Sequence, residues 1–226
     1  REKMNIVLNY VSDSSKEQVQ ELQKEISSLG SNSIVVQADV SKESDRKKIL
    51  DETLKEFNSV FLLANNAGVY SSKPGTPTWE LDVKEFDRIF DTNVKGLFFM
   101  TKLVGTWMID NKVKGAIVNI ASIAGLDASI SGSIYGASKS AVIGFTKTWS
   151  KEFGEKGIRV NAVAPGPVLT DLLKDMPNKR KEQLKKETPL GKLAEPKDIG
   201  ETVVFLAKNE AINGQTLVVD GGRIRH

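Results

Sequence analysis

The sequence has no cysteine, and its one histidine, His226, is the last residue. Without cysteine, neither disulfides nor thiol chemistry can operate, and such a chain is typical of the cytoplasm. A single histidine at that position is a poor candidate for a general base or nucleophile, and we predict no metal site. No apolar stretch approaches the roughly 18 residues that span a bilayer, so we predict no membrane partner.

The charge of the chain is nearly balanced. Its 32 Lys and Arg stand against 29 Asp and Glu, and the two signs alternate along the sequence. A nucleic-acid-binding protein is usually more basic, with its charge gathered on one face, so we predict no nucleic-acid partner. The densest basic run, residues 179–186, is interrupted by Glu182 and indicates the solvated face of a helix.

Short apolar runs alternate with longer amphipathic segments along the 226 residues. This alternation is typical of βαβ units, in which parallel strands are covered by helices on both faces of the sheet. Because there is no linker, repeat or low-complexity tract, we predict one domain over residues 1–226 with a three-layer, doubly wound α/β fold. The longest irregular segments are 127–134 and 165–189. Strands are expected at 6–8, 33–37, 60–64, 116–121, 159–164 and 215–219, and helices at 16–29, 43–57, 83–113, 135–153 and 196–206.

Polar and glycine-containing segments follow three of the expected strands. Asn65-Asn66-Ala67-Gly68 comes after one strand, Ser122 after the next, and Pro165-Gly166 after a third. Ligands of open parallel sheets bind beyond the carboxyl ends of the strands. We therefore expect the chemistry of this chain at that edge of the sheet.

Tyr135 and Lys139 lie four residues apart in an expected helix and so share one of its faces. An ammonium near a phenol favours the phenolate, which lowers the tyrosine pKa from its usual value of about 10 and suits it to acid–base catalysis. Ser122, at the end of its strand, offers a hydroxyl to a developing alkoxide. Taken alone, a tyrosine and a lysine at this spacing more often lie on the surface of an ordinary helix.

The order of the motifs is more specific than any one of them. Asp91-Thr92-Asn93 follows the Asn-Asn-Ala-Gly segment, Ser122 lies 13 residues before Tyr135, and Asp220-Gly221-Gly222 stands near the end. In this order they resemble the short-chain dehydrogenase/reductase family over essentially the whole chain, in particular the subgroup typified by 3-oxoacyl-[acyl-carrier-protein] reductase. The resemblance implies a Rossmann fold and an NAD(P)-dependent oxidoreductase.

The resemblance implies four catalytic residues, Asn93, Ser122, Tyr135 and Lys139. Tyr135 would protonate the carbonyl oxygen as hydride arrives at the carbon, and Ser122 would hold that oxygen. Lys139 would bond the nicotinamide ribose and lower the pKa of Tyr135, while Asn93 would support a water that links Lys139 to solvent. A purely structural role in hydrogen bonding stays open for Asn93 and Asn65.

The resemblance also implies where the cofactor lies. An acidic residue at the end of the strand expected at 6–8 would bind the ribose 2′-hydroxyl and repel a 2′-phosphate. The sequence there is Leu8-Asn9-Tyr10, and Asn9, Ser12 and Lys16 could reach a phosphate. This favours NADP(H), although nearby Asp13 keeps NAD(H) as an alternative. The other residues implied to contact the cofactor are Asp39 and Val40 at the adenine, Asn65, Ala67 and Gly68 along the nucleotide, and Pro165, Gly166, Val168 and Thr170 at the nicotinamide, beside Tyr135 and Lys139.

The sequence departs from the family pattern at its start. The family's first strand and its loop T-G-x-x-x-G-x-G, which carries the pyrophosphate at a helix N-terminus, are not present. That strand would lie in the middle of the sheet, and its loss would leave backbone groups of both neighbouring strands unpaired. We therefore expect roughly 30 further residues, the size of one βα unit, before Arg1. Asn58 also stands where the family commonly has glycine.

The resemblance implies that the chain reduces a 3-oxoacyl thioester on acyl carrier protein to the 3-hydroxyacyl form with NADPH, in fatty acid biosynthesis. Two alternatives stay open: a sugar or secondary-alcohol dehydrogenase with the same machinery, and a non-catalytic nucleotide-binding protein. The second alternative is expected to lack one of Ser122, Tyr135 and Lys139, and all three are present.

Substrate contacts and assembly are expectations of the same kind. Residues 169–189 would line the substrate with Leu172, Leu173, Met176 and Leu184, or these side chains anchor a helix. Lys112, Lys114 and Lys156 occupy places where carrier-protein reductases often have basic residues. The resemblance implies a homotetramer of D2 symmetry, whereas the sequence alone also allows a dimer. The interfaces would use the last strand and the two long helices, which carry Phe98, Phe99, Val104, Phe145 and Trp149.

Overall fold

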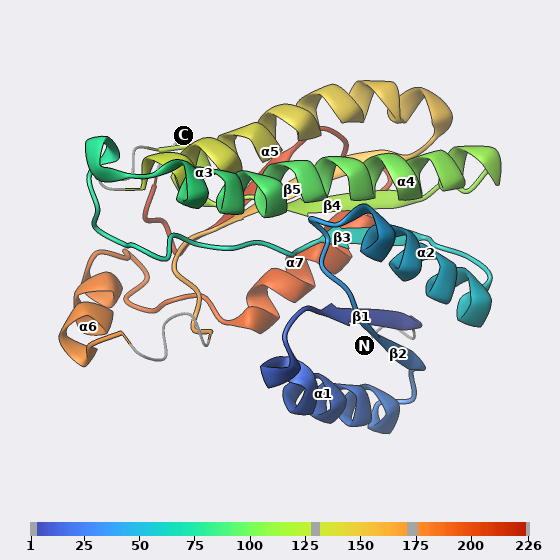
Figure 1. Cartoon of the computed structure of the whole chain (residues 1–226), viewed down its shortest axis with the longest axis horizontal. Helices are drawn as coiled ribbons and strands as arrows, with labels where there is room; N and C mark the ends of the chain where they lie inside the picture. Colours follow the sequence, from blue (N-terminus) through green and yellow to red (C-terminus); the bar gives the residue numbers. More distant parts are fainter. Residues whose placement is uncertain (1–3, 128–131, 171–175, 225–226) are drawn as a thin grey trace.

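The computed structural model describes residues 4–127, 132–170 and 176–224. Strands and helices alternate in it as the sequence predicts, and most predicted boundaries are within two residues of those found (Figure 1). The strands are β1 (Ile6–Tyr10), β2 (Ser33–Gln37), β3 (Leu62–Asn65), β4 (Ala116–Ile120), β5 (Arg159–Pro165) and β6 (Thr216–Val219). The helices are α1 (Lys16–Ser28), α2 (Glu43–Phe57), α3 (Val83–Phe90), α4 (Leu97–Asp110), α5 (Ser133–Glu152), α6 (Asn178–Lys186) and α7 (Pro196–Lys208).

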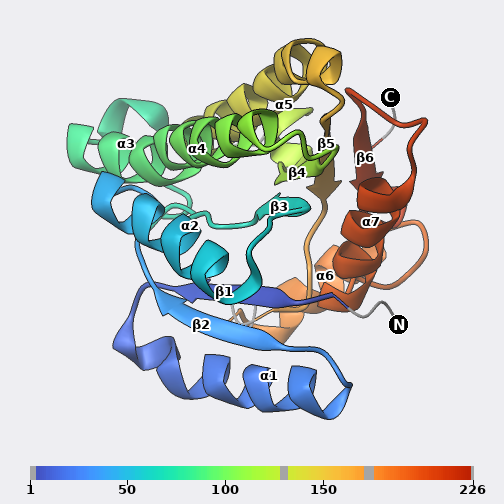
Figure 2. The same ribbon diagram turned by 90° about the vertical axis from the view of Figure 1, so that its right-hand side faces the viewer.

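The strands form two parallel sheets, β2-β1 and β3-β4-β5-β6. Figures 1 and 2 show the two-stranded sheet, with α1 on its outer face, set apart from the four-stranded one. Among the described residues, β1 pairs only with β2 and β3 only with β4. The division between the sheets lies between β1 and β3, which is the position of the family's first strand according to the resemblance.

Helices cover both faces of the four-stranded sheet, which confirms the predicted three layers (Figure 2). Successive side chains of a strand point to opposite faces. Along β4, Ile117 packs into a core with α2, α4 and α5, while the adjacent Val118 packs with Leu206 of α7. Both β4 residues are fully buried, as the continuously apolar sequence of this strand predicts.

The helix predicted over 83–113 is interrupted. Between α3 and α4 lies a π-helical turn, Asp91–Gly96, and α4 ends at Asp110. Gly96 permits this turn because a Cβ atom there would lie 3.0 Å from both Cγ2 and the carbonyl oxygen of Val40. Hydrophobic periodicity does not distinguish one wide turn within a helix, so the sequence did not reveal it.

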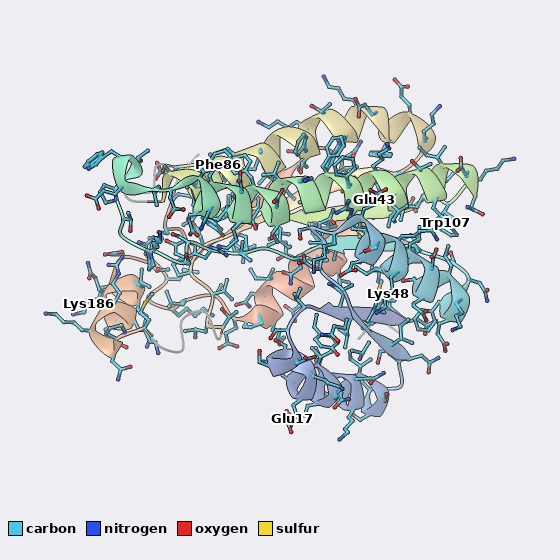
Figure 3. The ribbon with its side chains drawn as sticks, in the orientation of Figure 1. Glu17, Glu43, Lys48, Phe86, Trp107 and Lys186 are labelled. Atoms are coloured by element: carbon cyan, nitrogen blue, oxygen red, sulfur yellow. The ribbon has the colours of Figure 1, made fainter. Side chains whose placement is uncertain are left out.

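The segment predicted to be irregular, 165–189, contains the short helix α6. Leu184 is buried on its inner side with Leu193 and Met176, so Leu184 and Met176 anchor the helix as one reading of the sequence predicted. The basic side chains lie mainly outside, as expected of a solvated face, and Lys186 is at the outer surface (Figure 3). Leu172 and Leu173 lie outside the described residues.

Candidate active site

The carboxyl ends of β3, β4 and β5 lie at the same edge of the sheet because the strands are parallel. β3 ends at Asn65, Ser122 follows β4 by two residues, and β5 ends at Pro165. Helix α5 begins at this edge, and its first turns carry Tyr135 and Lys139. The predicted catalytic residues therefore come from three elements that meet at the edge where ligands of such sheets bind.

Two glycines let the turn after β4 lie directly against α5. This turn is a 3₁₀-helix, Ile123–Gly125, and Ser122 caps it by accepting a hydrogen bond from the Ala124 N–H at 3.1 Å. A Cβ on Gly125 would lie 2.6 Å from the backbone carbon of Lys139, and one on Gly136 would lie 2.9 Å from the Ala124 oxygen. Any larger residue would push the two elements, and with them Ser122 and Tyr135, apart.

The side chain of Ser122 lies close enough to the Tyr135 hydroxyl to favour its ionised form, which acts to lower the Tyr135 pKa. The structure thus brings together the serine and the phenol that the sequence predicts to converge on one substrate oxygen. Tyr135 is half-buried, and loss of hydration raises its pKa above the usual value for tyrosine, an effect that Ser122 only partly offsets. The expected lowering of the Tyr135 pKa is therefore not found.

Lys139 is buried, with 5% of its surface exposed, and its Nζ donates to the carbonyl oxygen of Ile120 at 2.8 Å. The same Nζ lies 5.8 Å from the centre of the Tyr135 ring. Burial disfavours the ammonium and lowers the pKa of Lys139 to about 8. The net shift of the Tyr135 pKa in the free protein is thus opposite to the predicted lowering, because burial acts against the charged form of both groups.

Asn93 lies in the π-helical turn with 1% of its surface exposed. Its Oδ1 accepts from the Val69 N–H at 2.7 Å, and its Nδ2 donates to the Val69 carbonyl at 2.9 Å and to Ser138 Oγ at 3.1 Å. Ser138 in turn donates to the Tyr135 carbonyl at 2.7 Å. The side chain of Asn93 therefore holds the segment after β3 against the first turn of α5, which is the structural role left open above.

Asn65 has the structural role in hydrogen bonding that the sequence left open for it. Its Nδ2 donates to Thr101 Oγ1 of α4 at 2.8 Å and to Asn119 Oδ1 of β4 at 2.9 Å. Asn119 Nδ2 in turn donates a hydrogen bond to Thr146 Oγ1 of α5 at 2.9 Å. These side chains are buried, and their bonds join two helices and two strands directly behind the site.

The residues near Gly68 fit the ribose of a nicotinamide cofactor. A Cβ on Gly68 would lie 3.3 Å from Asn93 Oδ1 and 3.4 Å from Lys139 Nζ, so the absence of a side chain leaves the space beside the ammonium open. Ala67 is half-buried and packs against the large core. An ammonium has three donors, and the bond to Ile120 uses one of them, so Lys139 can also bind hydroxyl groups in that space.

The loop after β5 is held on two sides. The Gly166 N–H donates to the Val219 oxygen at 3.0 Å, and Val168 forms a bridge with Ala194. Thr170 is exposed, and its N–H donates to the Val168 oxygen at 2.8 Å. The loop is thus fixed at the same edge as Tyr135, as expected for residues that contact the nicotinamide.

The residues expected near the adenine end lie on the two-stranded sheet. Asn9 is exposed at the carboxyl end of β1 and donates to the Ala38 carbonyl at 3.2 Å. Asp39 accepts from the backbone and hydroxyl of Ser41 at 2.9 and 2.7 Å. Val40 is buried against Gly96, so this end of the site touches the turn that carries Asn93.

The three lysines expected to contact a carrier protein lie at the wrong edge. Lys112 and Lys114 precede the amino end of β4, and Lys156 precedes the amino end of β5. Ser122 and Tyr135 lie at the opposite, carboxyl edge. Each intervening strand has five or more residues and spans roughly 17 Å or more, so these lysines do not line the site.

Sequence reasoning missed Tyr70, whose ring centre lies 4.8 Å from that of Tyr135 with the planes 69° apart. It also missed Arg88 and Glu85, which hold the segment containing Tyr70. The signal for Tyr70 was its place two residues after Gly68, in a segment that follows a strand. No pattern in the sequence joins Glu85 to this segment.

Residues 1–223 match the model of a protein family described as Enoyl-(Acyl carrier protein) reductase. The chain belongs to the short-chain dehydrogenase/reductase family. As a member of that family it is an NAD(P)-dependent oxidoreductase. Among the described residues there is no group of three acidic or histidine side chains that could hold a metal ion, and no helix long and apolar enough to cross a membrane.

Known members of the short-chain dehydrogenase/reductase family resemble this chain over most of their length. The 3-oxoacyl-[acyl-carrier-protein] reductase FabG of Staphylococcus epidermidis is 36% identical over 220 residues, which are 96% of this chain and 88% of the relative. A structure of ElxO with NADP bound matches with a TM-score of 0.86 at 31% identity and covers 96% of this chain and 87% of that one. The 3-oxoacyl-[acyl-carrier protein] reductase of Brucella melitensis matches with a TM-score of 0.88 at 28% identity, covering 99% and 83%.

Proposed function

We propose that this chain reduces the 3-oxo group of an acyl thioester, carried by acyl carrier protein, to a 3-hydroxy group with NADPH, in fatty acid biosynthesis. The observation that carries the proposal is that Ser122, after β4, and Tyr135, at the start of α5, lie at one edge of the sheet, where Ser122 acts on the Tyr135 phenol, with the buried Lys139 one helical turn away. The relatives named 3-oxoacyl-[acyl-carrier-protein] reductase support the substrate class.

Tyr135 is the proposed proton donor. Because burial raises its pKa, the phenol is protonated at neutral pH, which suits donation to a carbonyl oxygen rather than removal of a proton from an alcohol. NADPH, when bound, supplies the hydride. Tyr135 would give its hydroxyl proton to the carbonyl oxygen as the carbonyl carbon is reduced, and the phenolate left behind would regain a proton from solvent.

Ser122 and Lys139 are proposed to stabilise the charges that develop in this step. Ser122 Oγ accepts from the Ala124 N–H, so the hydroxyl is oriented and its one proton can be donated to the substrate oxygen. Lys139 is fixed at Ile120 and carries its charge at neutral pH, since its pKa is about 8. Its ammonium would bind the ribose hydroxyls and favour the phenolate formed on Tyr135. The proposed water beside Asn93 would complete the path to solvent.

The cofactor is proposed to be NADP(H). Asn9 at the end of β1 is exposed, and the one acid nearby, Asp13, accepts a hydrogen bond from Gln37 Nε2 at 3.0 Å. That contact directs the Asp13 carboxylate toward β2, which supports NADP(H) over NAD(H). The ElxO structure, which holds NADP, adds support.

The carrier protein is proposed to approach the basic face of α6 instead of Lys112, Lys114 and Lys156. Glu187, which caps α6, pairs with Arg223 after β6 at 2.5 Å, so the helix is tied to the carboxyl edge of the sheet. Lys186 lies at the outer surface of this helix (Figure 3). Contacts between such side chains and an acidic partner steer the encounter and weaken with salt.

A cytoplasmic homotetramer remains the proposed state of the enzyme. Part of the apolar surface predicted for the interfaces is used inside the chain, because Val104 and Trp149 are buried and Trp149 stacks on Phe145 with ring centres 4.8 Å apart. Phe99 and Phe86 remain 39% and 45% exposed. Both side chains are candidates for contacts with a second copy, and Phe86 is labelled in Figure 3.

Turnover of acetoacetyl thioester with NADPH tests the proposed function. Three assays serve as comparisons: the same thioester with NADH, glucose with NADP, and crotonyl thioester with NADPH. The thioester ketone with NADPH is expected to be the best pair. Fast oxidation of glucose without reduction of the thioester would establish the sugar dehydrogenase instead. Preference for crotonyl thioester would show reduction of a carbon–carbon double bond, the reaction in the name of the matching family model.

A further inference from the structure

Tyr70 stands beside the reacting phenol, and nothing in the proposed mechanism uses it. Its ring makes an edge-to-face contact with Tyr135, with ring centres 4.8 Å apart and planes at 69°. Yet 38% of Tyr70 remains exposed. The Tyr70 ring therefore packs on Tyr135 while the residue stays partly open to solvent.

The backbone of Tyr70 is held by a charged pair. Arg88 Nη2 donates to the Tyr70 carbonyl at 2.6 Å. The same guanidinium binds both carboxylate oxygens of Glu85, through Nε at 3.0 Å and Nη2 at 3.1 Å. This fork-to-fork geometry fixes the direction of the Arg88 side chain, and so the position of the carbonyl that it binds.

Glu85 also binds the two residues that follow Tyr70. Its Oε1 accepts from the Ser72 N–H at 2.7 Å and from Ser71 Oγ at 3.0 Å, and its Oε2 accepts from Ser72 Oγ at 2.8 Å. Only 4% of Glu85 is exposed, and its bonds to Arg88 and Ser72 lower its pKa to about 2. The carboxylate thus stays ionised at working pH and holds residues 70–72 on α3.

We propose that Tyr70 is a specificity-determining residue, whose ring limits the substituent that can stand on the carbonyl carbon of the substrate and favours an unbranched chain over a branched or aryl group. The inference rests on the proposed function. The carbonyl oxygen must lie within hydrogen-bond reach of the Tyr135 hydroxyl. A ring in contact with Tyr135 then stands where a substituent of that carbonyl passes. Arg88 and Glu85 are positioning residues, since they act through Tyr70.

The test compares Tyr70→Ala with Tyr70→Phe, using acetoacetyl and benzoylacetyl thioesters with NADPH. The quantity compared is kcat/KM for the benzoylacetyl thioester divided by kcat/KM for the acetoacetyl thioester. Loss of the ring in Tyr70→Ala is expected to raise this ratio by at least about 10-fold. Tyr70→Phe keeps the ring and should leave this ratio within about 3-fold of wild type. A ratio unchanged in Tyr70→Ala, or shifted equally in both variants, would overturn the inference.

Arg88→Lys tests the positioning role with a matched control. Lysine cannot bind both carboxylate oxygens of Glu85 and the Tyr70 carbonyl at once, so the ratio should shift in the same direction as in Tyr70→Ala, mainly through KM. Lys73→Gln removes an exposed ion pair to Asp82 in the same loop and should leave the ratio unchanged. An unshifted ratio in Arg88→Lys would overturn the positioning role. If the wild-type chain reduces neither thioester, the proposed function itself fails, which is a separate outcome.

Discussion

The Nζ atom of Lys139 lies 5.8 Å from the centre of the Tyr135 ring and donates to the carbonyl of Ile120, not to the phenol. Both groups are largely removed from water, and each is shifted toward its neutral form: the pKa of Tyr135 is raised and that of Lys139 is lowered to about 8. The free enzyme therefore holds a protonated phenol beside an ammonium that loses its proton in mildly alkaline solution.

The pH dependence of cofactor capture follows from the shifted lysine. The pKa of Lys139 is lowered from 10.5 to about 8, so the ammonium is present below pH 8 and is lost as the pH rises through that value. Since kcat/KM for NADPH reports groups of the free enzyme, it should be constant below about pH 7 and decline above pH 8. A steady-state profile from pH 6 to 10 measures this. A constant value up to pH 10 would show that Lys139 does not bind the cofactor as an ammonium.

Tyr135→Phe removes the proposed proton donor but keeps the ring. We expect kcat to fall by about 10²–10⁴-fold while the Kd for NADPH, measured by fluorescence titration, changes little. Ser122→Ala should lower kcat by about 10²–10³-fold, since it removes one donor to the developing oxyanion. Near-normal turnover in Tyr135→Phe would mean that the proton comes from another group.

Gly136→Ala should impair catalysis through geometry alone. The added Cβ would lie 2.9 Å from the Ala124 oxygen and would displace the turn that begins at Ser122. A displacement of about 1 Å at such a contact costs up to about 100-fold in rate, so we expect kcat to fall at least 10-fold. Gly200→Ala, in α7, meets no atom within 4 Å and should raise stability by about 0.5–1 kcal/mol without loss of activity. Equal activities of the two variants would contradict the argument.

Asn119 should be among the costliest side chains to truncate. It is fully buried and links Asn65 to Thr146, so Asn119→Ala leaves both partners short of a hydrogen bond. We expect a loss of about 2–4 kcal/mol in the free energy of unfolding, measured by urea denaturation. Asn111→Ala removes an exposed bond to the Trp107 carbonyl and should cost within about 0.5 kcal/mol. Similar losses would show that the buried network adds little.

Charge-reversal variants can show whether the carrier protein docks at the edge of the sheet near α6 or at the opposite edge. Lys186→Glu on α6 should lower kcat/KM for an acyl-carrier-protein substrate several-fold at low salt, with no change for a small thioester. Lys112→Glu, at the opposite edge, should leave both values unchanged. The effect of Lys186→Glu should diminish as ionic strength rises. A larger loss in Lys112→Glu would restore the docking site expected from the sequence.

The pattern of apolar runs was enough to predict the alternation of strands and helices, and the order of motifs was enough to select Ser122, Tyr135 and Lys139, which the structure brings to one edge. Spacing and position after a strand carry this information, because parallel strands place their carboxyl ends together. The same logic placed Asn65 directly after its strand, whereas the structure has it as the last residue of β3. The order of the elements and the position of these side chains depend on local sequence pattern and on topology, and both can be inferred from the sequence.

Other features depend on burial and on contacts between distant residues. The sign of the Tyr135 pKa shift reflects how much water surrounds the phenol and Lys139, which spacing along a helix does not reveal. The wide turn at Asn93 requires the close approach of Gly96 to Val40, from a different element. The bond from Arg88 to the Tyr70 carbonyl spans 18 residues without a recognisable motif.

The contact between Val40 and Gly96 has a consequence for how the two ends of the site respond to each other. Val40 belongs to the segment expected to receive the adenine, and Gly96 closes the wide turn whose Asn93 fixes the backbone beside Lys139. The side chain and carbonyl of Val40 lie directly against Gly96, so a shift of one segment toward the other would produce a clash. We therefore expect that a nucleotide held at the adenine end also restrains the turn that positions Asn93 at the acid–base end.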